Sequence, residues 1–263
     1  MYEIDKLLDT VKRIHFIGIG GAGMCPLAEI LHAKGYKLSG SDNNETDTLN
    51  RIRKLGIPVM MGQKAENIKG ADMIVYSAAI QRGNEELEAA LASGIPTFTR
   101  AELFGEVTKH FDNCIGICGT HGKTTTSSMI TQILMEAGLD PSAVIGGKLP
   151  LIDAYGRYGH SQNFVCESCE FNNTFLHMNP DMAVILNIDE DHLDFFGNLD
   201  NIKKSFRKFA DLTTKTIIYN GDDANTVDTL KGIEGKKLIS VGGLWLHGDD
   251  EWVGLSASKP TCQ

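Results

Sequence analysis

The chain has 263 residues, 42% of them hydrophobic and 22% charged, a composition typical of a globular protein with room for two medium-sized domains. The formal net charge of -9 argues against a nucleic-acid-binding protein, whose contact surface is usually rich in Lys and Arg. No apolar run approaches the roughly 20 residues that span a membrane, and the N-terminus lacks the apolar stretch of a signal peptide. We therefore expect a cytoplasmic protein without a membrane partner.

Apolar strand-like runs alternate with helical patterns through the first hundred residues. Strands are predicted at 13–19, 36–42, 57–62, 71–80 and 95–100. Helices are predicted at 24–34 and 84–93, and a polar–apolar segment ends at Gly56. Such β-α-β alternation predicts a parallel sheet with right-handed crossovers.

A second α/β cycle begins near residue 113. A short apolar strand leads into a Gly-containing loop and a helix that ends at Gly138. Further strands are predicted at 142–147, 163–168, 181–188, 215–220 and 236–242, with a long helix around 198–211. We expect a boundary between residues 105 and 112, and therefore two domains, 1–108 and 109–263.

The first glycine loop, "GIGGAGM" at 18–24, lies between a predicted strand and a predicted helix. Gly18, Gly20 and Gly23 have the spacing of a dinucleotide-binding turn, in which the backbone approaches a pyrophosphate at a helix N-terminus. Asp42 ends the next strand, where a dehydrogenase holds the ribose hydroxyls of NAD. Taken alone, the loop fits NAD, another diphosphate ligand, or a turn that binds nothing.

The second loop, "GTHGKTTT" at 119–126, is a shortened phosphate-binding loop. The usual spacing G-x-x-x-x-G-K-[ST] would place a glycine at position 117, where this chain has Ile117. Lys123 can nevertheless reach the β- and γ-phosphates, and the Thr124 hydroxyl can bind Mg²⁺. An ordinary helix cap is the alternative, but a cap does not require Gly-Lys. If ATP binds at this second loop, the first loop is free to bind a different diphosphate, such as the pyrophosphate of a nucleotide-activated substrate.

Acidic residues follow two later strands. Glu167 lies at the end of one of them with Glu170 three residues on, and the run from Asp189 to His192 comes after another. Ligands of open α/β sheets bind beside the carboxyl ends of the strands, where carboxylates and imidazole can hold a divalent metal. The acidic run alone would be interpreted as a solvated loop.

Histidines and cysteines carry less information. His15 is expected to be a partly buried structural residue. The six cysteines have no framework spacing, which favours free thiols over disulfides. The lone pair Cys166-x-x-Cys169 lacks the second pair that a structural zinc site requires.

Seven stretches in the same order resemble the Mur ligases, and in particular those members that add the first amino acid. They are "GIGGAGM", "SGSD", "YSAAI", "RAELF", "GTHGKTTT", "CESCEFNNTFL" and "NIDEDHLDFF", and the resemblance covers residues 11 to about 220. It implies a Rossmann-like N-terminal domain that binds a UDP-sugar, followed by a P-loop central ATPase domain with a mainly parallel sheet.

The resemblance also implies a reaction in peptidoglycan precursor synthesis. The carboxylate of UDP-N-acetylmuramate takes the γ-phosphate of ATP, and the amine of L-alanine then displaces phosphate from the acyl phosphate. The implied cofactors are ATP and Mg²⁺, and the implied partners are these two substrates, with no nucleic acid.

Individual roles carry over from the same resemblance. Catalysis is assigned to Lys123, Glu167 and His192, and metal binding to Thr124, Glu167 and His192, with His192 at a second Mg²⁺. The implied ATP contacts are Gly119, Thr120, His121, Gly122, Lys123, Thr124, Thr125 and Asn187. The implied UDP-sugar contacts are Gly18, Gly20, Gly21, Gly23, Ser41, Asp42, Ser77 and Arg100.

The chain departs from the family pattern at its end. Complete members continue into a third domain, whereas this sequence ends at Gln263, and the Gly-rich stretch 242–263 does not resemble the family's continuation. We therefore expect an incomplete central domain with impaired ligation. A UDP-sugar- or nucleotide-binding fragment without catalysis is one alternative, and an NAD-linked oxidoreductase is another.

Overall fold

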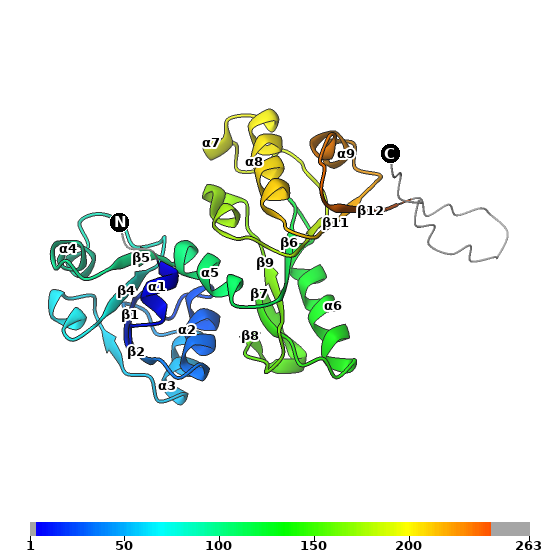
Figure 1. The fold of residues 1–263 in the computed structure, drawn as a ribbon. Coiled ribbons are helices and arrows are strands. Elements are labelled where there is room, and N and C mark those ends of the chain that lie inside the picture. Colours follow the sequence, from blue (N-terminus) through cyan, green and yellow to red (C-terminus); the bar gives the residue numbers. More distant parts are fainter. Residues whose placement is uncertain (1–3, 243–263) are drawn as a thin grey trace. The chain divides into compact units, whose positions relative to one another are not determined.

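The computed structural model describes residues 4–242, so the divergent stretch 242–263 lies outside the described residues except for Gly242. The chain divides into two compact units (Figure 1). The first comprises the residues up to Val107 together with Asp140–Ser161, and the second comprises Thr108–Leu139 together with the residues from Gln162 onward. The first change of unit falls inside a helix, Arg100–Lys109, beside the expected boundary after residue 108.

The first unit contains a five-stranded parallel sheet in the order β3-β2-β1-β4-β5. Its elements up to the change of unit are α1 (Ile4–Leu8), β1 (Arg13–Ile17), α2 (Met24–Ala33), β2 (Lys37–Asp42), α3 (Asp47–Lys54), β3 (Val59–Met61), η1 (Ala65–Ile68), β4 (Met73–Tyr76), α4 (Glu85–Ala92), β5 (Thr97–Thr99) and α5 (Arg100–Lys109). The central strand β1 is buried from Ile14 to Ile17, as expected for a parallel strand covered on both faces.

Side chains at the helix starts explain where two helices of this unit begin. The Thr46 hydroxyl accepts the N–H of Leu49 at the start of α3, and the Asn84 side chain accepts two N–H groups at the start of α4. Such caps satisfy amides that have no partner within the helix. The polar–apolar segment that ends at Gly56 therefore contains a capped helix.

An antiparallel ribbon of β7 (Ser142–Leu149) and β8 (Ala154–Arg157) also belongs to the first unit, with the short 3-10 helix η2 (Pro150–Ile152) between its strands. The sequence predicted the first of these strands but not the second. Gly156 of β8 lies so close to Pro26 of α2 that a Cβ there would be 2.7 Å from the proline Cβ. The ribbon therefore packs tightly against α2.

The second unit contains parallel strands in the order β12-β11-β10-β6-β9. Its elements are β6 (Asn113–Cys118), α6 (Lys123–Glu136), β9 (Asn163–Glu167), η3 (Phe171–His177), β10 (Met182–Ile185), α7 (Leu193–Phe196), α8 (Leu199–Leu212), β11 (Thr216–Asn220), α9 (Ala224–Leu230) and β12 (Lys237–Val241). The strands that precede the two acidic segments, β9 and β10, pair with β6 on its two sides. This order brings the acidic segments to the phosphate-loop strand.

Aromatic packing forms the core of the second unit. The Phe175 ring stacks on Phe209 with centroids 4.8 Å apart and contacts Phe206 edge-on. Both α8 phenylalanines are completely buried. The sequence prediction of an α/β fold with a mainly parallel sheet in the second half is confirmed.

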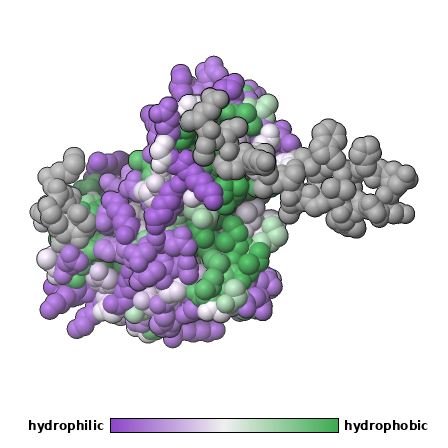
Figure 2. Space-filling model, turned by 45° about the vertical axis from the view of Figure 1, so that its right-hand side comes forward, coloured by the Kyte–Doolittle hydropathy of each residue, from purple (hydrophilic) through white to green (hydrophobic). Residues whose placement is uncertain are grey.

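Helix α6 packs with an unusual polarity. Its fully buried side chains are Ser127 and Thr131, whereas Met129 and Ile133 are 54% and 65% exposed. Apolar residues also gather on the molecular surface in Figure 2.

Within residues 4–242, no helix has the length and apolar character needed to cross a membrane.

Candidate functional sites

The first glycine loop connects β1 to α2 and is held by the backbone of β2. The amides of Gly18 and Ile19 both donate to the Ser41 carbonyl, at 2.9 and 3.0 Å. Gly18 has a φ of +83°, which favours glycine, and a Cβ there would lie 3.3 Å from the Cβ of Ser77. The loop thus has a fixed shape, with the N-terminus of α2 directly after it.

Asp42 binds the loop rather than facing solvent. Its carboxylate is 8% exposed and accepts the N–H groups of Gly20 at 2.8 Å and Asn44 at 3.0 Å. The hydroxyl of Thr48 donates to the carbonyl of the same Gly20. Each Asp42 oxygen therefore accepts one protein amide, and contact of this carboxylate with a ligand stays a prediction.

Ser41 belongs to a buried polar network below the loop. Its hydroxyl donates to Glu86 Oε2 at 2.5 Å, and Glu86 Oε1 lies 2.7 Å from His15 Nε2. The other ring nitrogen of His15 lies 2.8 Å from the Ser39 hydroxyl. Ser41, Glu86 and His15 are all 0% exposed, so His15 is fully rather than partly buried. Contact of the Ser41 side chain with a ligand stays a prediction.

Two other predicted residues lie beside the first loop. Ser77 follows β4, and its amide donates to the Ile17 carbonyl at 3.1 Å. The Arg100 guanidinium, at the start of α5, lies next to Gly23: a Cβ on that glycine would be 3.3 Å from Cζ. The structure therefore brings a permanent positive charge to the glycine loop.

The second loop connects β6 to α6 and is fixed by Asn187, which follows β10. The Thr120 amide donates to the Asn187 carbonyl at 3.1 Å. The His121 amide donates to the Asn187 side chain at 2.8 Å, and the side-chain amide returns a bond to the His121 carbonyl at 3.1 Å. Asn187 was predicted to contact the nucleotide, and it binds the loop that would hold the phosphates.

Lys123 and Thr124 begin α6 and face the acidic residues after β9. The Thr124 hydroxyl donates to Glu167 Oε2 at 2.9 Å. Lys123 Nζ lies 3.1 Å from Glu170 Oε1, and it also donates to the Gly119 and Thr120 carbonyls. Thr125 continues the first turn of α6. Thr124 and Glu167 supply adjacent hard oxygen donors, which fit Mg²⁺.

His192 lies in a second group of possible metal ligands. One ligand atom each from Glu170, Asp191 and His192 lies within 4.8 Å of the other two. The imidazole also contacts the Phe171 ring, with centroids 4.8 Å apart. The structure thus pairs Thr124 with Glu167 and places His192 with two carboxylates that the sequence-based ligand set left out.

The described cysteines carry free thiols. Cys166 lies 3.9 Å from Cys114 (Sγ to Sγ), and burial raises its pKa well above the ordinary value. Burial also raises the pKa of Cys169. Burial thus makes both thiols poor nucleophiles, and the interpretation of Cys166-x-x-Cys169 as incidental stays a prediction.

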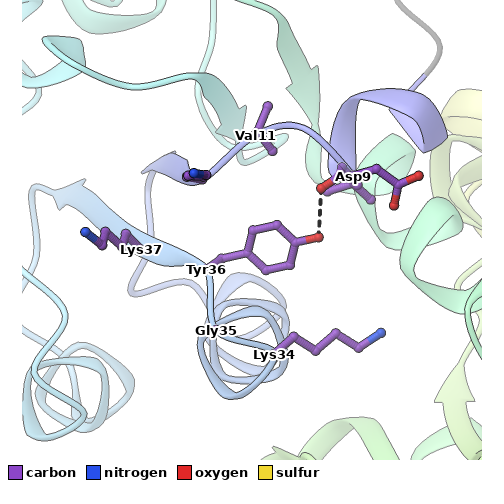
Figure 3. Close-up of a pocket in the computed structure, with 8 residues that line it drawn as sticks. Asp9, Val11, Lys34, Gly35, Tyr36 and Lys37 are labelled. Atoms are coloured by element: carbon purple, nitrogen blue, oxygen red, sulfur yellow. Dashed lines mark hydrogen bonds between the residues drawn. The ribbon is translucent and has the colours of Figure 1, made fainter.

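A pocket of about 460 Å³ lies elsewhere in the first unit (Figure 3). Its lining contains none of the predicted site residues; it consists of Leu8, Asp9, Val11, Lys12, Lys34, Gly35, Tyr36 and Lys37. The Tyr36 hydroxyl donates to the Leu8 carbonyl at 3.0 Å. Figure 3 shows Lys34 and Lys37 pointing in different directions, so these two amines do not converge on one anion.

Comparison with protein families gives two adjacent matches. Residues 13–112 match the model "Mur ligase family, catalytic domain", and residues 117–244 match "Mur ligase middle domain". A UDP-N-acetylmuramate–L-alanine ligase of Agathobacter rectalis is 45% identical over 245 residues, which are 92% of this chain and 53% of the relative. The corresponding ligase of Caldanaerobacter subterraneus is 45% identical over 91% of this chain and 52% of its own length. The chain spans about half the length of the curated relatives it matches.

Solved structures give similar matches. The UDP-N-acetylmuramate:L-alanyl-gamma-D-glutamyl-meso-diaminopimelate ligase of Neisseria meningitidis superposes with a TM-score of 0.80 at 29% identity, over 90% of this chain and 82% of that one. The UDP-N-acetylmuramate–alanine ligase of Thermotoga maritima gives a TM-score of 0.77 at 27% identity, over 88% of this chain and 52% of that one. Both structural matches therefore extend over most of this chain.

Proposed function

Because the chain belongs to the Mur ligase family, we propose that it binds ATP with Mg²⁺ at the second loop and UDP-N-acetylmuramate at the first, for ATP-dependent ligation of L-alanine. The observation that carries this proposal is the arrangement of Lys123 and Thr124 at the start of α6 beside Glu167 at the end of β9. The names of the curated relatives support the choice of substrates.

At the second loop, the chain's own residues position phosphate. Lys123 would donate to the β- and γ-phosphates, and the first amides of α6 lack partners within the helix. Thr124 and Glu167 would hold Mg²⁺, which neutralises the charge that develops on the transferred phosphoryl group. Positioning and electrostatic stabilisation are the main contributions a protein makes to this chemistry.

The proposed reaction has two steps. The muramate carboxylate oxygen bonds to the γ-phosphorus and ADP leaves, which gives an acyl phosphate. The alanine amine then attacks the acyl carbon, and the carbon–oxygen bond to phosphate breaks. Inorganic phosphate leaves and the amine loses one proton.

At the first loop, the proposed ligand is the pyrophosphate of UDP-N-acetylmuramate in place of that of NAD. The fixed backbone of the loop and the nearby Arg100 guanidinium suit a pyrophosphate. The Asp42 carboxylate already accepts two backbone amides of the protein, one on each oxygen. Gly20, Gly21 and Gly23 allow close approach of the ligand, and direct roles for Ser41 and Ser77 remain part of the proposal.

The identity of the amine substrate has one structural alternative. The Neisseria enzyme, whose name specifies a tripeptide, superposes with the higher TM-score of the two structures, 0.80 against 0.77. The curated relatives named for L-alanine, at 40–48% identity, favour the single amino acid. Offering both amines in the same assay distinguishes them.

The test uses the 263-residue chain. Calorimetric titrations measure binding of Mg·ATP, UDP-N-acetylmuramate and NADH, and phosphate release is then followed with and without L-alanine or the tripeptide. Phosphate release that depends on L-alanine supports the ligase. Binding of both ligands without turnover reduces the proposal to the binding function alone. Binding of NADH without affinity for the UDP-sugar overturns it.

The Lys123→Ala variant tests the assignment of the second loop. Loss of a charged hydrogen-bond donor should weaken Mg·ATP binding roughly 10- to 100-fold and leave UDP-sugar binding unchanged. Lys204→Ala, which removes an exposed lysine from α8 of the same unit, is the matched control and should change neither. Equal ATP affinity in the two variants would remove Lys123 from the site.

A further inference from the structure

The ammonium group of Lys123 is fully engaged within the protein. It donates to the Gly119 carbonyl at 2.6 Å, to the Thr120 carbonyl at 3.2 Å and to Glu170 Oε1 at 3.1 Å. A lysine ammonium has three N–H donors, so these contacts use all of them. While they persist, Lys123 has no donor left for a phosphate.

Glu170 is buried, and one of its oxygens is under-used. The residue is 2% exposed, and among the described residues its Oε2 atom has no hydrogen-bond partner, although it lies 3.0 Å from Lys123 Nζ. The contact with Lys123 is therefore electrostatic on that side, without the geometry of a hydrogen bond. A buried carboxylate oxygen without such a bond is unfavourable unless a cation or a donor compensates it.

A second positive charge can reach the same carboxylate. Glu170 shares the group of ligand atoms within 4.8 Å with Asp191 and His192. In an octahedral Mg²⁺ site neighbouring ligand atoms are about 3.0 Å apart and opposite ones about 4.2 Å, so the three side chains would move inward to share an ion. One buried carboxylate thus lies between an ammonium group and a possible divalent-cation site.

We propose that Glu170 is a positioning residue that holds Lys123 in the nucleotide-free protein and releases it when a divalent cation binds Glu170, Asp191 and His192. The cation draws the carboxylate charge away from the ammonium, and the freed N–H donor turns to the triphosphate. This inference rests on the proposed function, because it assumes that Lys123 serves ATP. In this proposal the divalent cation has two roles: it binds the phosphates, and it must be present before Lys123 can contact the triphosphate.

The direct test needs neither a variant nor a nucleotide. The chain is treated with an amine-acylating reagent in the presence of EDTA or Mg²⁺, and labelling of Lys123 is measured by peptide mass spectrometry relative to Lys204. Release from Glu170 should raise the labelling rate of Lys123 several-fold with Mg²⁺ and leave Lys204 unchanged. A Lys123 rate that Mg²⁺ does not alter overturns the inference, whether or not the chain later proves to bind ATP.

A pair of variants tests the role of Glu170 through ATP affinity. In Glu170→Gln, binding of ATP in EDTA should become about tenfold tighter than in the parent chain, and the gain from added Mg²⁺ should shrink. Glu136→Gln is the control, because it removes the same charge from an exposed position at the end of α6 and has no assigned role in either loop. If both variants tighten metal-free binding equally, general charge removal explains the effect and the inference fails.

Labelling also checks the variant itself. Lys123 in Glu170→Gln should react rapidly in EDTA and show no further increase with Mg²⁺. Fast labelling of every lysine would report unfolding instead, in which case the experiment on the parent chain decides. Failure of ATP binding combined with Mg²⁺-dependent Lys123 labelling would overturn the proposed function and leave the link between Glu170 and Lys123 standing.

Discussion

At the scale of single residues, Gly20 shows most clearly why the first loop has its sequence. Its amide donates to Asp42 Oδ2 at 2.8 Å, and its carbonyl accepts the Thr48 hydroxyl. A Cβ at this position would lie 2.9 Å from Asp42 Oδ2 and 3.2 Å from Leu49 Cβ. Both backbone polar groups of this residue are therefore engaged, and only glycine fits without displacing the carboxylate.

The Gly20→Ala variant should accordingly be destabilised. Overpacking of this kind costs about 1–3 kcal/mol, and displacement of Asp42 should also weaken UDP-sugar binding. Gly21→Ala is the control, because its nearest contact would be an ordinary 3.4 Å to the Gly18 carbonyl oxygen. Denaturant unfolding measures both variants, and equal stabilities would contradict the steric argument.

At the scale of elements, a buried polar network joins two strands to a helix. Glu86 in the first turn of α4 meets His15 of β1 and Ser41 of β2, and the Ser41 carbonyl holds the first two amides of the glycine loop. Removal of one partner from this buried network is strongly unfavourable, because the remaining polar groups stay buried without compensation.

We expect Glu86→Ala to lower the free energy of unfolding by about 3–5 kcal/mol. Glu85→Ala provides the comparison: both acids lie in the first turn of α4 and lose the same favourable interaction with the helix dipole, but Glu85 is exposed. The difference between the variants in urea unfolding reports the buried network. A difference below about 1 kcal/mol would show that the network contributes little.

Several elements could be predicted from the sequence because their signals are local. Apolar runs such as the one ending at Ile17 mark buried parallel strands, and Gly-rich turns mark both loops. Strand β8 was missed because the four residues Ala154–Arg157 are too short for a clear alternation. The joining of Glu170 with His192 was also missed, because it depends on β9 and β10 pairing with opposite sides of β6. Strand order is a tertiary property that no local pattern contains.

At the scale of the whole molecule, the exposed apolar side of α6 is the feature expected to affect association between molecules. Met129 and Ile133 are one helical turn apart, and both are more than half exposed. Figure 2 shows hydrophobic residues gathered on the surface. Exposed apolar area of this kind promotes association between molecules.

The Ile133→Glu variant should therefore reduce self-association of the chain, measured by sedimentation velocity at increasing concentration. Its free energy of unfolding should change by less than about 0.5 kcal/mol, because the side chain is 65% exposed. Gln132→Glu adds the same charge to an exposed neighbour without removing apolar surface. If Gln132→Glu has the same effect, net charge rather than the apolar face controls association.

The anchoring of the second loop by Asn187 has a consequence for conformational entropy. Since Thr120 and His121 are already bonded to Asn187, ordering of the loop belongs to the folding of the second unit and not to nucleotide binding. The phosphate site is preorganised, so nucleotide binding carries little entropic cost for ordering the loop. Local opening at the end of β10 would thus erase the phosphate site while the rest of the unit stays folded.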